Sequence, residues 1–225
     1  MKKRNGQMSD SLLMGVCLTL GGGFQDAYSY NCRDHVFANA QTGNIVLFGQ
    51  NVASMNWGGA LHYLVPIAAF AGGVVAAEWI RYFFFKTQKI HWRQIVLGLE
   101  ICLLVFAGTL PQACNMAANV LMSFACAMQV DSFRKFRGIP CATTMCIGNL
   151  RSGMEMLCSY QITKEGTAKK RTFYYGILIF TFAVGAAFGA IVTKVMQERA
   201  IWIVAILLLV GFILMFQKEG TRGTV

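Results

Sequence analysis

The chain has 225 residues, of which 56% are Ala, Val, Ile, Leu, Met, Phe, Trp, Tyr or Cys and only 13% are charged. Soluble domains carry about 25% charged residues, so the composition excludes an ordinary soluble protein and predicts an integral membrane protein. The net charge of +10 does not indicate a nucleic-acid partner, because Lys and Arg stand in short clusters between apolar stretches. The expected partners are the lipid bilayer and a small-molecule or ion substrate. Assembly into a homo-oligomer is a further possibility.

Six long apolar stretches each approach the roughly 20 residues that a helix needs to cross a bilayer. They lie near residues 11–31, 60–80, 94–110, 113–132, 172–193 and 200–216. Two weaker stretches, 35–53 and 140–160, are interrupted by polar residues and predict re-entrant or broken helices. The expected fold is therefore an all-α polytopic membrane protein with six transmembrane helices and two re-entrant segments.

The positions of Lys and Arg predict the orientation, because cytoplasmic loops of membrane proteins are enriched in these residues. With a cytoplasmic N-terminus and six crossings, the basic clusters at 2–4, 81–93, 134–137, 164–171 and 218–222 all fall inside. Only Arg33, Lys194 and Arg199 fall outside. Eight crossings would instead turn the basic 81–93 loop outward. The pattern predicts a multi-pass protein of the inner membrane with both termini in the cytoplasm.

Two polar motifs of the first half recur in the second half with the same spacing. Phe24-Gln25-Asp26-Ala27-Tyr28 and Gln41-Thr42-Gly43-Asn44-Ile45 are echoed by Gln129-Val130-Asp131-Ser132-Phe133 and Cys146-Ile147-Gly148-Asn149-Leu150. Each half, 1–110 and 111–225, then holds three crossings and one re-entrant segment. Because three is an odd number, the second half must be inserted upside down relative to the first, which predicts an inverted repeat of three plus three spans.

We single out three carboxylates inside apolar stretches, Asp26, Asp131 and Glu100. A charge there costs about 3 kcal/mol, so Asp26 must face a partner, a cavity or the bundle interior, and Gly21-Gly22-Gly23 before it would allow another backbone to approach closely. Asp131 holds the equivalent place but stands beside Arg134, so a position at the headgroup level explains it equally well. Glu100 has no acid at the corresponding place in the second half. It is a candidate proton carrier, although it could also reach toward the interface.

The weaker stretches contain the second polar motif. Gly43-Asn44 and Gly148-Asn149 each precede a short apolar run, as expected where a half-helix begins and leaves backbone N–H groups free. Two such N-termini meeting from opposite faces would suit an anion or a polar zwitterion, whereas an ordinary kinked helix is the alternative. Arg151 and Glu155 are spaced to pair on one helix face, either to tune a coupling ion or as a structural pair near the surface.

The chain resembles the YoaK-like family of bacterial membrane proteins, a domain of unknown function. The resemblance covers essentially the whole length and rests on three motifs, Gln25-Asp26-Ala27, residues 37–44, and residues 142–150. The chain departs from the family where it has Val130-Asp131-Ser132 in place of Gln-Asn-Ala, and Ile147 in place of Thr. What the resemblance implies is a multi-pass inner-membrane protein of about six spans, without an established activity.

The leading hypothesis is a small secondary transporter or channel-like carrier for a small polar or anionic solute. The candidate substrate-binding residues are Gln25, Asp26, Asn39, Gln41, Thr42, Gly43, Asn44, Gln129, Asp131, Thr144, Gly148 and Asn149. The candidate coupling or proton-carrying residues are Asp26, Glu100, Arg151 and Glu155. Neither a catalytic residue nor a metal or cofactor is predicted, since the sequence carries no recognised nucleophile or metal motif. A non-catalytic scaffold subunit and, less favoured, a membrane-embedded enzyme are the alternatives.

Overall fold

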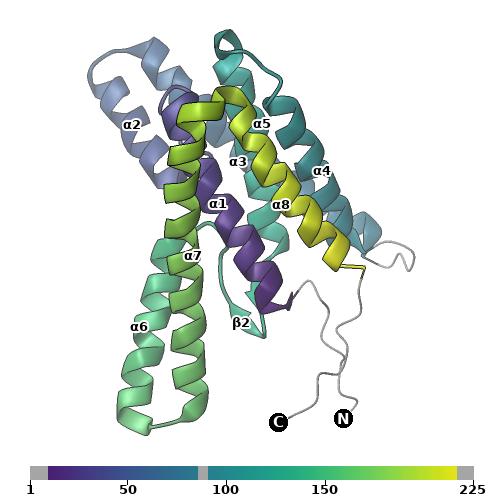
Figure 1. Cartoon of the computed structure of the whole chain (residues 1–225). Helices are drawn as coiled ribbons and strands as arrows, with labels where there is room; N and C mark the ends of the chain where they lie inside the picture. The colour runs from purple at the N-terminus through teal and green to yellow at the C-terminus, as the bar shows by residue number, and fades with distance from the viewer. Residues whose placement is uncertain (1–9, 86–90, 217–225) are drawn as a thin grey trace.

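The computed structural model describes residues 10–85 and 91–216, and these are almost entirely α-helical (Figure 1). The helices are α1 (Leu12–Cys32), α2 (Gln41–Ala53), α3 (Trp57–Phe84), α4 (Trp92–Ala107), α5 (Asn115–Ser132), α6 (Cys146–Thr163), α7 (Gly166–Met196) and α8 (Ile201–Leu214). Two 3-10 turns, η2 (Gln112–Cys114) and η3 (Gln197–Ala200), precede α5 and α8. A small hairpin pairs β1 (Lys135–Phe136) with β2 (Ile139–Pro140). The predicted all-α class is confirmed.

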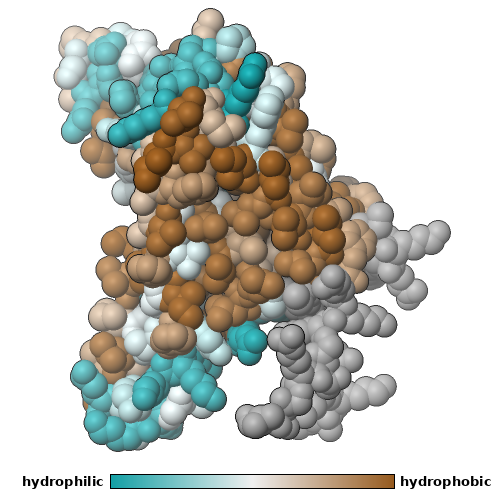
Figure 2. All heavy atoms as spheres, viewed as in Figure 1, coloured by the Kyte–Doolittle hydropathy of each residue, from teal (hydrophilic) through white to brown (hydrophobic). Residues whose placement is uncertain are grey.

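Three helical stretches in the described part of the chain are long and apolar enough to cross a membrane. They are Trp57–Phe84, Gln112–Ser132 and Gly166–Leu214. The last stretch contains α7, η3 and α8, and the chain reverses direction at η3 (Figure 1). On the face shown in Figure 2, apolar side chains form a band across the middle of the molecule, and hydrophilic ones gather at its two ends. Length, composition and surface together identify a helical membrane protein.

Helices α2 and α6 leave the middle of the molecule in opposite directions. Each follows a non-helical segment that returns toward the middle, and α2 extends to the upper end of Figure 1 whereas α6 extends to the lower end. The main packing partners are α1 with α7 and α5 with α3, while α4 packs against α8. If α1, α2, α3 and α4 are exchanged with α5, α6, α7 and α8 in that order, the pair α1–α7 becomes the pair α5–α3, and the pair α4–α8 stays the same. The packing of the two halves is therefore related by this exchange.

Glycines allow the two long helix pairs to approach closely. A Cβ on Gly23 of α1 would collide with the Phe182 carbonyl of α7, and one on Gly185 of α7 would collide with the Leu20 carbonyl of α1. Between α3 and α5, Gly73 meets the Phe124 carbonyl in the same way. Without a hydrophobic effect between helices in lipid, this close backbone contact supplies much of the packing energy.

Arg33, directly after α1, connects three segments at the upper end of the molecule. Its guanidinium is fully buried and donates to the carbonyls of Ala107 and Leu110, both at 2.9 Å, and to Asn115 Oδ1 at 2.9 Å. Its Nε donates to the Tyr28 hydroxyl at 2.9 Å, which itself donates to the Glu198 carbonyl at 2.8 Å. The last carbonyls of a helix lack helical partners, so this fork of donors caps the end of α4.

Candidate functional site

The first elbow, residues 34–40, folds back against the helix that precedes it. Asp26 Oδ1 accepts a hydrogen bond from the backbone N–H of Asn39 at 2.7 Å, and Ser29 Oγ accepts one from Ala38 N at 3.1 Å. The side chain of Asn39 donates to the carbonyl of Gly22 at 3.1 Å. The carboxylate predicted to need a partner in the membrane thus has one, the backbone of the elbow.

Asn44 and Asn149 hold the two elbows by the same pair of hydrogen bonds. Asn44 accepts from Phe37 N at 3.0 Å and donates to Phe37 O at 2.7 Å. Asn149, on α6, accepts from Ala142 N at 3.2 Å and donates to Ala142 O at 2.7 Å. In both cases the partner lies seven residues earlier in the chain. These amides act as clamps for the backbone, and their polar atoms face the elbows.

Gly22 contacts residues of both elbows. Its carbonyl accepts from Asn39 of the first elbow, and a Cβ added to it would lie 2.7 Å from Thr144 Cγ2 of the second elbow, residues 141–145. Thr143, next to Thr144, accepts a hydrogen bond from Gln129 Nε2 of α5 at 3.1 Å. The absence of a side chain at position 22 therefore lets both elbows reach the same turn of α1.

The two elbows differ in how they are tied. Asp131, which corresponds to Asp26, makes its ion pair with Arg134, and Arg134 also binds Glu78 of α3 at 2.7 Å. Asp131 Oδ2, Thr144 Oγ1 and Gln129 Oε1 are buried and form no hydrogen bond with the described residues. The carboxylate of Asp26 thus holds the first elbow, whereas the carboxylate of Asp131 binds Arg134 instead of the second elbow.

A second buried polar group lies where α1, α4 and α5 meet. Cys126 Sγ donates to Gln25 Oε1. Gln25 also lies beside Glu100, and Asn39 lies beside Cys126. Glu100 is fully buried, and neither of its oxygens makes a hydrogen bond of ordinary geometry within residues 10–85 and 91–216. We call Gln25, Asp26, Asn39, Glu100 and Cys126 the α1–α4–α5 cluster.

Several predicted site residues lie away from this cluster. Gln41 donates to Ala38 O at 3.0 Å and accepts from Asn44, so it supports the clamp. Thr42 and Gly148 are exposed, and Gly43 packs against the ring of Phe37. Arg151 and Glu155 pair at 2.9 Å on an exposed face of α6. Thr42 and Gly148 thus lie at the surface and not at a shared centre. The elbow residues before them converge instead.

Four residues of the site region were not singled out from the sequence, namely Gly22 by itself, Ser29, Cys126 and Arg33. The run Gly21-Gly22-Gly23 signalled a close approach, but its sequence does not show which segment approaches. Cys126 lies among small residues of α5 and its only signal is its place one turn before Gln129. Arg33 was one of three basic residues on the side predicted to be poor in positive charge.

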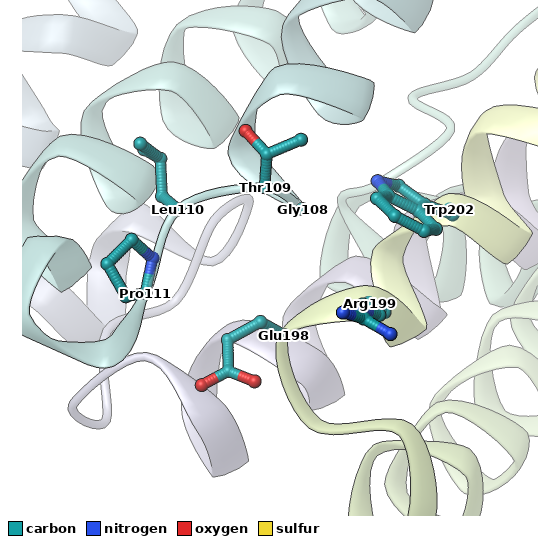
Figure 3. Close-up of a pocket in the computed structure, with 7 residues that line it drawn as sticks. All are labelled: Gly108, Thr109, Leu110, Pro111, Glu198, Arg199 and Trp202. Atoms are coloured by element: carbon teal, nitrogen blue, oxygen red, sulfur yellow. The ribbon is translucent and has the colours of Figure 1, made fainter.

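A surface pocket of about 360 Å³ lies at the upper end of the molecule, apart from the α1–α4–α5 cluster. The turn after α4 and the turn before α8 line it from opposite sides (Figure 3). Its lining residues are Gly108, Thr109, Leu110, Pro111, Glu198, Arg199 and Trp202. None of them was predicted from the sequence as a site residue. Among the residues described, no group of three or more His, Cys, Asp or Glu side chains is placed to hold a metal ion.

These features define a helical membrane protein with a buried polar cluster beside its first elbow. Residues 14–214 match the family described as a protein of unknown function (DUF1275), and the chain belongs to that family. The resemblance drawn from the motifs is thereby confirmed. No curated protein and no solved structure matches the chain.

Proposed function

We propose that this protein is a small secondary carrier built as an inverted repeat of two three-span units, each with a re-entrant elbow. In this topology α1, α3, α4, α5, α7 and α8 cross the inner membrane, and α2 and α6 return to the side from which their elbows entered. The exchange of packing partners between the halves supports it, as do the matched clamps of Asn44 and Asn149. The termini lie in the cytoplasm, on the side of the basic clusters.

The convergence of both elbows on Gly22 is the observation that carries the proposal. In transporters with inverted repeats the substrate site lies near the midplane, where broken segments of the two halves meet. Here Asn39 and Thr144 reach the same residue of α1 from the two halves. Irregular backbone at that depth is tolerated only against protein or a cavity, and the elbows are where we expect a substrate to bind.

The polar atoms around Gly22 favour a small neutral polar solute over an anion. Asp26 already occupies the Asn39 N–H that an anion would use, and no cationic side chain belongs to the α1–α4–α5 cluster. Asn39 Oδ1 and Thr144 Oγ1 are buried and make no hydrogen bond with the described residues. Such groups are costly to leave unpaired, so a solute with hydrogen-bonding groups would be held there.

The difference between the bonds that hold the two elbows supports a carrier with two states. A carrier must close one side of its site while the other opens, and related halves can do this by exchanging the same set of bonds. The first elbow has its carboxylate bond, and the second elbow lacks the corresponding one. A scaffold subunit or an open channel has no need of this difference.

The test is solute flux in proteoliposomes over a broad panel of ions and polar metabolites. Wild-type protein is expected to transport a small polar solute, and Asp26→Asn and Asn39→Ala are expected to reduce its flux at least tenfold. Gln50→Ala, which removes an exposed amide on α2, serves as the control and should transport normally. The absence of flux for every solute, or equal flux in all four proteins, contradicts the carrier and leaves the scaffold. Turnover of a lipid or quinone would instead indicate an enzyme.

A further inference from the structure

We propose that Glu100 is a proton-binding site of the carrier, occupied by a proton in the present state and linked to the first elbow through Gln25 and Cys126. The link to a transport cycle rests on the proposed function, whereas the bound proton does not. Glu100 has no counterpart acid in the second half, because the corresponding position there is the buried Ala205 on α8. The site is therefore an addition to the symmetric framework.

Among the residues that the structure describes, none beside Glu100 carries a positive charge that would balance a carboxylate. Of the helices around α4, α1 contributes Asp26, α5 contributes Cys126, and α8 has no titratable residue. On α3, Glu78 is engaged with Arg81 at 3.0 Å and with Arg134. On α4 itself, Arg93 is about two turns away and bound to Asp10 at 2.7 Å and to Ser132 O at 3.0 Å.

Burial without a cation favours the neutral acid. Glu100 is 0% exposed, and its two oxygens form no ordinary hydrogen bond with the described residues. A carboxylate left in such a place loses its hydration without gaining an ion pair, at a cost of several kcal/mol, and avoids that cost by binding a proton. Asp26 differs because the Asn39 N–H donates to it directly. Glu100 and Asp26 are thus expected to be in opposite protonation states.

A series of polar contacts leads from Glu100 to the elbow. Gln25 of α1 lies beside Glu100, its Oε1 accepts from Cys126, and its Nε2 makes no hydrogen bond with the described residues. Cys126 in turn lies beside Asn39, whose backbone is bound by Asp26. A change at Glu100 therefore reaches the first elbow through two side chains.

Release of the proton would rearrange these contacts. When the site opens, the Glu100 O–H bond breaks, the electron pair stays on the carboxylate, and the proton passes to a water molecule as hydronium. The carboxylate then offers acceptors to Gln25 Nε2, so the amide turns toward Glu100 and its bond with Cys126 weakens. Loss of that bond frees Cys126 and removes one support of Asn39. The proton state of Glu100 would in this way set how firmly the first elbow is held.

Infrared spectroscopy of the purified full-length protein tests the bound proton directly, since the C=O stretch of a carboxylic acid is separate from the bands of a carboxylate. At neutral pH the wild-type protein should show this acid band. Glu100→Gln should lose it, and Asp34→Asn, which removes an exposed carboxyl after α1, should keep it. A wild-type spectrum without the band overturns the proposal even if the variant fails to fold, and so does a band that persists in folded Glu100→Gln.

The link to transport has a separate readout. In proteoliposomes, wild-type flux of the panel solute with the largest signal should increase several-fold when an inward proton gradient is imposed. Flux through Glu100→Gln should no longer respond to the gradient. An equal response in both proteins overturns the link. If the acid band is present but no solute is transported, the proton site stands and the carrier is rejected. If solute is transported but the acid band is absent, the carrier stands and the proton site is rejected.

Discussion

Individual glycines in this chain have different structural roles, and their surroundings predict different effects of a methyl group. Gly23 lies against the backbone of α7, where Phe182 and Ala186 cannot move without shifting the helix. A methyl group added to Gly49 on α2 would meet no atom within 4 Å. The first glycine is needed for close contact, while the second contributes only backbone freedom.

Gly23→Ala is therefore expected to lower the thermal unfolding midpoint in detergent, because the methyl group separates α1 from α7. Gly49→Ala should raise stability by about 0.5–1 kcal/mol, since Ala is the better residue inside a helix. Circular dichroism during heating measures both. If Gly23→Ala unfolds at the wild-type temperature, the close contact of α1 with α7 is wrong.

Replacement of Arg33 by lysine is expected to destabilise the protein, although the positive charge is kept. Its planar fork serves Ala107, Leu110, Asn115 and Tyr28 at once, and a single ammonium group cannot reach all of them. With a loss of about 1.5–3 kcal/mol for each hydrogen bond to a charged group, Arg33→Lys should markedly lower the midpoint of thermal unfolding. Arg199→Lys, at an exposed position, is the control and should unfold as the wild type does. Equal midpoints for the two variants would contradict the capping role of Arg33.

At this scale the sequence predicts burial better than bonding. A carboxylate within an apolar stretch must be satisfied, and Asp26 is 7% exposed with a backbone partner. The amides of Asn44 and Asn149 were expected to face a substrate, and they instead hold Phe37 and Ala142. The residue type indicates only that a buried amide needs partners. Whether those partners are a ligand or the backbone depends on the path of the elbow, which a single sequence does not contain.

At the level of elements, the second elbow offers a test of two states. If Asp131 leaves Arg134, it can accept the backbone N–H of Thr144, as Asp26 accepts that of Asn39. Arg134→Gln removes the competing cation and should favour this arrangement. The second elbow would then be held more firmly, and Cys141 within it and Cys146 directly after it would be protected.

Thiol labelling measures this protection. In Arg134→Gln, maleimide labelling of Cys146, located by peptide mass mapping, should be several-fold slower than in the wild type. Arg81→Gln serves as the control, because it breaks the pair with Glu78 and leaves Asp131 bound to Arg134. Faster or unchanged labelling of Cys146 in Arg134→Gln would contradict the exchange of partners.

Helices were also predictable at this scale, whereas the path of the backbone before α2 and α6 was not. Each of the six strong apolar stretches contains an α-helix, because burial of backbone in an apolar chain leaves few other solutions. The weak stretches begin as irregular backbone, and α2 and α6 start only at Gln41 and Cys146. Their preceding residues bond to Asp26, Ser29 and Gln129 on other helices. Such distant partners leave no periodic signal in the local sequence.

For the whole molecule, the sides on which the connecting turns lie distinguish six crossings from eight. The turn between α2 and α3 is at the upper end of Figure 1, and the turn between α6 and α7 is at the lower end. If α2 crossed the membrane completely, the first turn would instead share a side with the second. Met55 in the first turn is 79% exposed, and Lys170 near the second is exposed as well.

Met55→Cys and Lys170→Cys are therefore expected to react from opposite sides of a sealed membrane. In right-side-out vesicles, a membrane-impermeant maleimide should label Met55→Cys at once, and Lys170→Cys only after permeabilisation. The physical reason is charge, since Lys164, Lys169, Lys170 and Arg171 cluster at the lower end and basic loops are retained in the cytoplasm. Peptide mass mapping separates the new thiols from the native cysteines, and permeabilised vesicles control for reactivity. Labelling of both positions from one side would mean that α2 spans the membrane. That result would contradict the inverted arrangement of the two elbows.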